Sequence, residues 1–340
     1  MKYSIKILTC ITLCMFSIPA HAYKYDIGRT TFDLTGYGTI GILEPEFKNP
    51  EIINDWRVRA GMNFRATNTT TIGAVYSIDA IAIDDDRPVA DAFGLIQNKN
   101  IGRLELGLTS SVAQKLGLGL PDVGGLRTND RPLFYKKIHP AHAVIADTAL
   151  NTGRRAPRAN FVSNKIGNTQ IGVSVSGLDD DYNYAVDVGL KIRQPDGKLK
   201  SAFSIAASFM DRPDGFNTDT FTPQTTADWR TQFSAAMNIQ YNSWIWALTA
   251  RAIYDRNPIG VPTDGVAFGT GLSYDLLNYS ISLSYIMSDT GIWRDEHPDY
   301  MDHTVIGSFR YKYSEYTTGW ASIGLTSETP FVSAGMAINF

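Results

Sequence analysis

Residues 278–287 read Asn-Tyr-Ser-Ile-Ser-Leu-Ser-Tyr-Ile-Met, a nearly continuous alternation of polar and apolar side chains. The apolar row comprises Tyr279, Ile281, Leu283, Tyr285 and Met287. In a β-strand alternate residues point to opposite faces, whereas a helix would spread this row over every side. The stretch therefore predicts a strand with one apolar face and one polar face.

The same alternation recurs along the rest of the chain. We expect sixteen strands, at 31–43, 55–66, 69–81, 89–98, 100–110, 157–166, 169–179, 183–194, 198–210, 227–241, 243–256, 262–275, 278–289, 301–313, 315–327 and 330–340. Tight breaks such as 67–68 and 167–168 alternate with mostly longer, polar connections such as 44–54 and 211–226. The short connections near 180 and 328 are exceptions. Tight turns are therefore expected at one edge of the sheet and long loops at the other.

Two architectures use many alternating strands, the soluble β-sandwich and the membrane-spanning β-barrel. A sandwich needs strands of only about 5–6 residues and does not predict long and short connections in alternation. A barrel predicts strands of about 9–11 residues, an even strand count and short turns on one side only. We therefore predict an all-β fold, a transmembrane antiparallel up-and-down barrel of about sixteen strands.

The composition agrees with a barrel. Aromatic residues make up 11% of the 340 residues, and charged residues 19%, below the roughly 25% of soluble domains. The mean hydropathy of −0.14 excludes a bundle of transmembrane helices, each of which needs about 20 apolar residues in a row. The net charge of −3 argues against a nucleic-acid-binding protein. An outward apolar row and an inward polar row on each strand together account for a mean hydropathy near zero.

The first 22 residues are expected to be a cleaved signal peptide. Lys2 and Lys6 precede an apolar stretch at 7–18, which ends in the small-x-small pattern of residues 20–22. A transmembrane anchor would need a longer apolar run. Both cysteines lie inside this segment, so the mature chain at 23–340 is expected to be a single barrel domain without disulfides. Loss of the two lysines would take the net charge from −3 to −5.

The last predicted strand ends on an aromatic residue. Val332, Ala334, Met336 and Ile338 alternate with smaller or polar residues, and Phe340 completes the row. Such a strand resembles the C-terminal signal that delivers outer-membrane proteins to the barrel-assembly machinery. An ordinary edge strand is the alternative.

Four stretches resemble the trimeric general porins of Gram-negative outer membranes. Residues 33–38 are similar to that family's opening strand, and residues 59–64 to its second strand. Residues 92–95 and 102–107 are similar to the strand pair before its long loop, and residues 121–125 to an acidic Pro-Glu-Phe-Gly-Gly element of that loop. The resemblance implies a sixteen-stranded barrel, a homotrimer and a location in the outer membrane beside lipopolysaccharide.

The connection from 111 to 156 contains no alternating segment. Loops of this length in a compact domain usually have a function. Its residues mix polar side chains with apolar ones that could pack on a wall, namely Leu116, Leu118, Leu120, Leu133 and Phe134. The resemblance implies that this loop folds into the lumen and sets the narrowest cross-section. An extracellular flap is the other interpretation.

The second predicted strand carries candidate pore residues. Arg57 and Arg59 share a row opposite the apolar row of Met62 and Phe64, and an arginine facing lipid would cost roughly 2–4 kcal/mol at the bilayer midplane. The arginines are therefore expected to face the lumen. Arg59 also matches a pore-wall arginine of the resembled family.

The resemblance implies further residues of a pore constriction. Arg87 lies near one such arginine position, and Arg154, Arg155 and Arg158 bracket another at the start of a strand. Asp122 matches the acidic residue of the long loop. The family's second acid and inward lysine are replaced by apolar residues, glycine and tyrosine, which leaves the ion preference open. Each arginine could also be an ordinary solvated charge of the lumen or rim.

These observations predict an outer-membrane porin for passive diffusion of small hydrophilic solutes and ions, without catalytic residues, cofactor or metal. A substrate-specific channel for sugars or anions and a surface adhesin are the alternatives. A barrel lipase would need a histidine beside an outward serine in mid-strand. None of the histidines has that position; they are His21, His139, His142, His297 and His303. The pair at 139 and 142 has no cysteine and no regular helix signal to fix the spacing of metal ligands.

Overall fold

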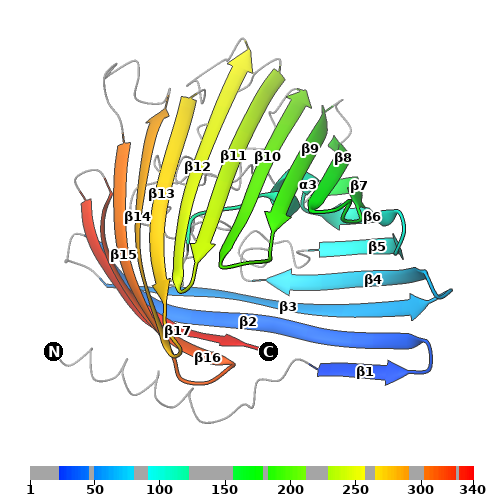
Figure 1. Ribbon diagram of the computed structural model, residues 1–340, viewed down its shortest axis with the longest axis horizontal. Coiled ribbons are helices and arrows are strands. Elements are labelled where there is room, and N and C mark those ends of the chain that lie inside the picture. The colour runs from blue at the N-terminus through cyan, green and yellow to red at the C-terminus, as the bar shows by residue number, and fades with distance from the viewer. Residues whose placement is uncertain are drawn as a thin grey trace.

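The computed structural model describes residues 23–45, 50–79, 91–121, 156–178, 183–211, 229–256, 265–290, 302–326 and 329–340. They form one antiparallel sheet that curves round on itself (Figure 1). The strands are β1 (Tyr23–Ile27), β2 (Thr30–Pro45), β3 (Glu51–Arg65), β4 (Thr70–Asp79), β5 (Asp91–Asn98), β6 (Gly102–Thr109), β7 (Ala156–Ser163), β8 (Thr169–Leu178), β9 (Asn183–Gln194), β10 (Leu199–Asp211), β11 (Trp229–Tyr241), β12 (Trp244–Arg256), β13 (Gly265–Asp275), β14 (Tyr279–Thr290), β15 (Asp302–Lys312), β16 (Thr317–Thr326) and β17 (Thr329–Asn339). A short helix, α3 (Val112–Leu116), follows β6.

Strands β2 to β17 make a closed ring. Each pairs with the next along the chain, and β17 returns to β2, where Gly335 lies opposite Gly41. The predicted sixteen-stranded antiparallel barrel is confirmed, with strand ends within four residues of those expected. Closure leaves no open edge, so the backbone groups of every strand can be paired within the sheet.

The first strand, β1, was not predicted. It pairs with Thr30 to Leu34 of β2, a stretch that β17 does not reach. The chain end meets β2 just beyond this point, because Gly36 N donates to Phe340 O at 2.6 Å and Phe340 N donates to Gly36 O at 2.9 Å. β1 and β17 therefore share one edge of β2. Five residues are too few for the alternation to stand out in the sequence.

The two ends of the barrel differ. The connections β3–β4, β5–β6, β7–β8, β9–β10, β11–β12, β13–β14 and β15–β16 have two to five residues, and we call this the short-turn end. The tightest is Asn242-Ser243, where Asn242 adopts φ of 51°, a conformation that asparagine tolerates better than most residues. Most connections at the opposite, long-loop end are longer, as predicted.

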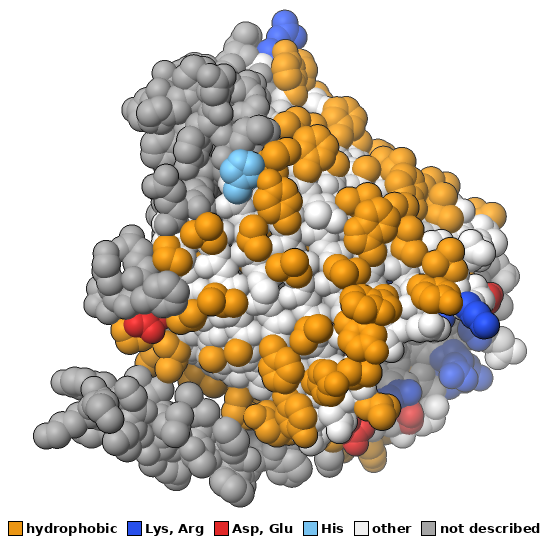
Figure 2. All heavy atoms as spheres, turned by 60° about the vertical axis from the view of Figure 1, so that its left-hand side comes forward, with side chains coloured by type: hydrophobic (Ala, Val, Ile, Leu, Met, Phe, Trp, Pro, Cys, Tyr) orange, Lys and Arg blue, Asp and Glu red, His pale blue; other side chains and the backbone are white. Residues whose placement is uncertain are grey.

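The outer face of the barrel is apolar. Along β14, Tyr279, Ile281 and Leu283 are exposed, whereas Ser280 and Ser284 on the other face are buried. Exposed apolar side chains also line the outer rows of the other strands, and Figure 2 shows hydrophobic side chains spread over one outer face, with charged side chains at its margins. The buried row is mostly polar but includes apolar residues such as Phe93 and Leu95 of β5 and Trp320 of β16. Such a surface is stable against hydrocarbon rather than against water. We call the opposite face the inner wall.

Aromatic side chains gather near both ends of the outer face. At the long-loop end Phe209, Trp229 and Tyr254 follow one another across β10, β11 and β12, with ring centroids 6.0 and 5.5 Å apart. At the short-turn end Trp244 and Tyr274 lie 4.6 Å apart. Aromatic girdles of this kind lie at the two interfaces of a membrane. No helix among the described residues is long and apolar enough to cross a membrane.

Candidate functional site

The arginines of β3 lie on the inner wall, as the sequence predicts. Arg59 pairs across the sheet with Thr35 and Ser77, whereas Met62 and Phe64 of the opposite row are 46% and 44% exposed on the outer face. The Nε atom of Arg59 is buried and has no hydrogen-bond partner in the described part of the chain. The inner wall therefore presents a guanidinium whose hydrogen-bonding capacity is only partly used.

Arg57 is on the same row as Arg59, opposite Tyr37 of β2. Both arginine side chains are only partly exposed. Their alternation with outward residues places the two guanidinium groups on one side of the strand.

Arg158, another predicted pore arginine, is already engaged. Its side chain is buried, and Nη1 donates to Asp187 Oδ2 of β9 at 2.9 Å. Ser174 Oγ of β8 donates to the same oxygen at 2.7 Å. A buried charge without a partner is costly, so Arg158 and Asp187 each stabilise the charge of the other. These contacts also link β7 to β8 and β9. The other predicted constriction residues, Arg87, Asp122, Arg154 and Arg155, lie outside the described residues.

The first residues of the predicted long loop lie against the inner wall. Ser111 caps α3 by accepting a hydrogen bond from Gln114 N, and Val112 N donates to Ser174 Oγ at 3.4 Å. Further along, Leu118 N donates to Ser204 Oγ of β10 at 3.2 Å. Figure 1 shows α3 beside β7, β8 and β9. Residues 122–155 of this loop are outside the described part.

A row of inward glycines receives this segment. A Cβ atom added to Gly172 of β8 would lie 3.0 Å from Val112 Cβ, and one added to Gly189 of β9 would lie 3.2 Å from Leu116 Cδ1. Real Cβ atoms seldom approach so closely, so any larger residue at Gly172 would push the helix away from the wall.

The glycines continue on β13. An added Cβ at Gly269 would lie 2.9 Å from Leu120 Cδ1, and one at Gly271 would lie 2.8 Å from Pro121 Cδ. We refer to Gly172, Gly189, Gly269 and Gly271 as the glycine track. Residues 112–121 therefore follow the inner wall from β8 to β13, filling the space that missing side chains leave.

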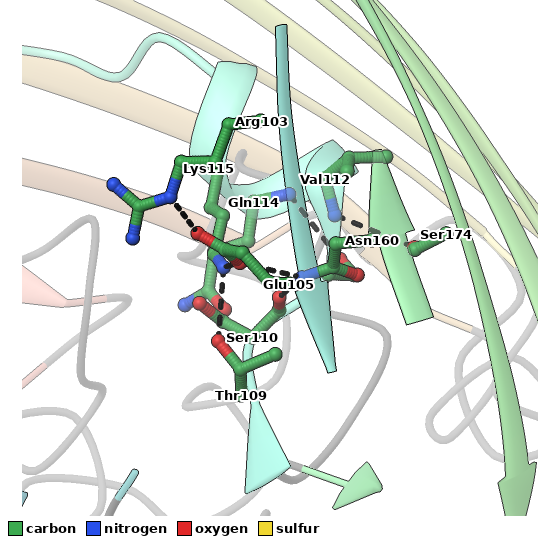
Figure 3. A network of polar contacts seen from close by, with 10 residues as sticks. Arg103, Glu105, Thr109, Ser110, Val112, Gln114, Lys115, Asn160 and Ser174 are labelled. Carbon is green, nitrogen blue, oxygen red and sulfur yellow. Dashed lines mark hydrogen bonds and ion pairs between the residues drawn. The ribbon is translucent and has the colours of Figure 1, made fainter. Parts of the chain in front are cut away.

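A buried polar network fixes the start of this segment (Figure 3). Lys115 of α3 forms an ion pair with Glu105 of β6 and also donates to Thr109 Oγ1 at 2.9 Å. Arg103 Nε lies 2.8 Å from the other oxygen of Glu105, and Asn160 Nδ2 donates to Glu105 Oε2 at 3.1 Å. Burial lowers the pKa of Lys115, an effect that the carboxylate of Glu105 opposes. One buried carboxylate thus holds together β6, β7 and the helix.

This network and the glycine track were not predicted. Strand alternation places Glu105 and Asp187 on the inner wall, so their direction could have been read from the sequence. Their partners could not, because Asn160 lies 55 residues from Glu105 and Arg158 lies 29 residues from Asp187. The described residues contain no group of three or more side chains suited to a metal ion.

No family model matches the sequence, and no curated protein matches it. Solved structures do. In-vitro folded OmpT, an outer-membrane protein of Vibrio cholerae, has a TM-score of 0.65 and 12% identity over 94% of this chain and 100% of its own. The trimer form of that protein has a TM-score of 0.63 and 12% identity, over 92% of this chain and 99% of its own. A porin structure refined at 1.8 Å resolution has a TM-score of 0.64 and 13% identity, over 91% of this chain and 100% of its own. The chain therefore has the sixteen-stranded fold of the porins, as its sequence motifs predict.

Proposed function

We propose that this protein is an outer-membrane porin that allows passive diffusion of small hydrophilic solutes and ions. The observation that carries this proposal is the closed barrel with an apolar outer face and a polar inner wall, along which the start of a long loop is laid. The predicted signal peptide at 1–22 would direct export, and the final strand ending on Phe340 would direct assembly. Passive diffusion needs no catalytic group and no cofactor, because solutes move down their concentration gradients.

The proposed constriction combines a basic wall with an acidic loop residue. Arg57 and Arg59 supply the wall, and Arg59 Nε is buried without a hydrogen-bond partner among the described residues. Asp122 would supply the opposing charge, directly after the segment that follows the glycine track. Facing charges set ion preference in such pores.

Four other arginines belong to the same proposal. Arg87, Arg154 and Arg155 would add to the basic wall from the connections before β5 and β7. Arg158 differs from them, because Asp187 neutralises much of its charge. We therefore assign Arg158 mainly to holding the wall in place.

We also propose a homotrimer. The supporting observation is the likeness to a protein whose structure is described as a trimer form. The outer faces of β2 and β17 carry small residues such as Ala334, at which a neighbouring barrel could approach closely. Lipopolysaccharide would surround the remaining outer face. Native electrophoresis that gave only a monomer would contradict the trimer and leave the channel untouched.

Planar-bilayer recording of refolded protein tests the function. We expect stepwise, ohmic conductance increases. Their absence would refute the channel. In Arg59→Ala the permeability ratio should shift towards cations, whereas Arg59→Lys should retain most of the original preference because the charge remains. An unchanged ratio in Arg59→Ala would remove that residue from the constriction.

A further inference from the structure

Two cations stand side by side on the inner wall of β9, away from the predicted constriction. Lys191 and Arg193 are two residues apart, so their side chains point to the same face. Lys191 is only 7% exposed, because the segment after α3 covers it. Its Nζ donates to the backbone oxygen of Gly117 at 3.3 Å. Arg193 is exposed to the lumen towards the short-turn end.

No carboxylate in the described structure balances this pair. The next side chain on the same face of β9 is Arg193, a second cation. The nearest acid on the same row, Asp187, is taken up by Arg158 and Ser174. A largely buried ammonium beside a guanidinium is unfavourable unless an anion shares the space.

The neighbours across the sheet are neutral, and two of them can donate hydrogen bonds from their side chains. Lys191 lies opposite Gln170 of β8 and Ser204 of β10, and Arg193 lies opposite Ala202. Ser204 Oγ accepts the hydrogen bond from Leu118 N, which leaves its own proton available for another acceptor. The wall around the two cations therefore offers two neutral donors, Gln170 and Ser204, and neither cation forms an ion pair with a described carboxylate.

We propose that Lys191 and Arg193 form a binding site for a small anion, such as inorganic phosphate or the carboxylate of a solute, on the lumen side of β9. The site rests on the proposed channel, since the anion reaches it through the lumen. A guanidinium grips such a group through paired N–H donors, and the ammonium adds a point charge. Gly117 holds the ammonium in place from the side of the loop segment. The site lies between residues 112–121 and the short-turn end of the barrel. It would therefore attract anions in the part of the lumen beside the start of the loop.

Bilayer recording in potassium chloride, with inorganic phosphate added at increasing concentration, tests this site. Bound phosphate should reduce the chloride current in a saturable way. Arg193→Gln and Lys191→Gln should each raise the phosphate concentration for half-reduction by about tenfold, the loss expected for one charge-assisted hydrogen bond. Arg193 is exposed, so its replacement should leave folding intact even if Lys191→Gln impairs it.

Lys312→Gln is the matched control. Lys312 also lies on the inner wall near the short-turn end, but on β15, where it pairs across the sheet with Thr318. Its replacement removes the same charge from another sector of the lumen. An equal phosphate effect in this control would overturn the site in favour of general lumen charge. So would a chloride current insensitive to phosphate in the unmodified protein, and in both cases stepwise conductance would show that the channel itself remains.

Discussion

Replacement of Gly172 by valine tests whether the glycine track positions the loop segment. The Cβ alone would lie 3.0 Å from Val112 Cβ and 3.1 Å from Leu116 Cδ1. Carbon atoms pack best at about 3.5–4.0 Å, so α3 must move by about 0.5–1 Å from the wall, and by more for the two added methyl groups. Overpacking of this kind costs about 1–3 kcal/mol. The helix can move only towards the barrel axis, because the sheet closes the other side.

Two measurements follow from this displacement. The free energy of unfolding, from urea titration in detergent micelles, should fall by about 1–3 kcal/mol. Single-channel conductance should also fall, because the segment would narrow the lumen. A variant with unchanged conductance and unchanged stability would refute the role of the glycine track.

Gly177 supplies the control within the same strand. It lies on the outward row of β8, and an added Cβ there would meet nothing within 4 Å. Gly177→Val should therefore leave conductance unchanged and stability nearly so. If both valine variants behaved alike, the effect would come from the strand and not from contact with α3.

Three further changes have defined outcomes. Lys115→Met should lower the free energy of unfolding by about 1–3 kcal/mol, because the buried Glu105 carboxylate loses one partner while Arg103 and Asn160 remain, and the added change Glu105→Gln should restore part of the loss in a double-mutant cycle. Phe331→Ala should cost about 3–5 kcal/mol in the same titration, because this ring is fully buried. Leu277→Ala should change stability by less than about 0.5 kcal/mol, because that turn residue is 98% exposed.

Much of the fold could be predicted because a barrel wall obeys a period of two. The row of Arg57 and Arg59, for example, could be assigned to the lumen from the apolar character of Met62 and Phe64 alone. Strand β1 escaped prediction because it depends on where β17 stops on β2, a tertiary fact.

The candidate site could be predicted less fully. Gly172 and Gly269 stand in inward rows of the sequence, but nothing local shows which side chains fill the space above them. Likewise Lys115 lies in a five-residue helix without a periodic signal, and its partner Glu105 is ten residues earlier on a strand. Interactions between a wall and a loop that crosses it leave no fixed spacing in the chain.

The seam between β17 and β2 has a consequence for how the molecule forms. Gly41 and Gly335 face each other across it although almost three hundred residues separate them, whereas every other junction of the ring joins strands that are neighbours along the chain. Until β17 pairs with β2, the sheet is open and has two edge strands with unpaired backbone groups, each of which can pair with another chain. Loop-closure entropy also opposes the joining of such distant segments. Pairing of β17 with β2 therefore carries the largest loop-closure cost of any junction in the ring, and protection of the two unpaired edges until they meet would limit aggregation.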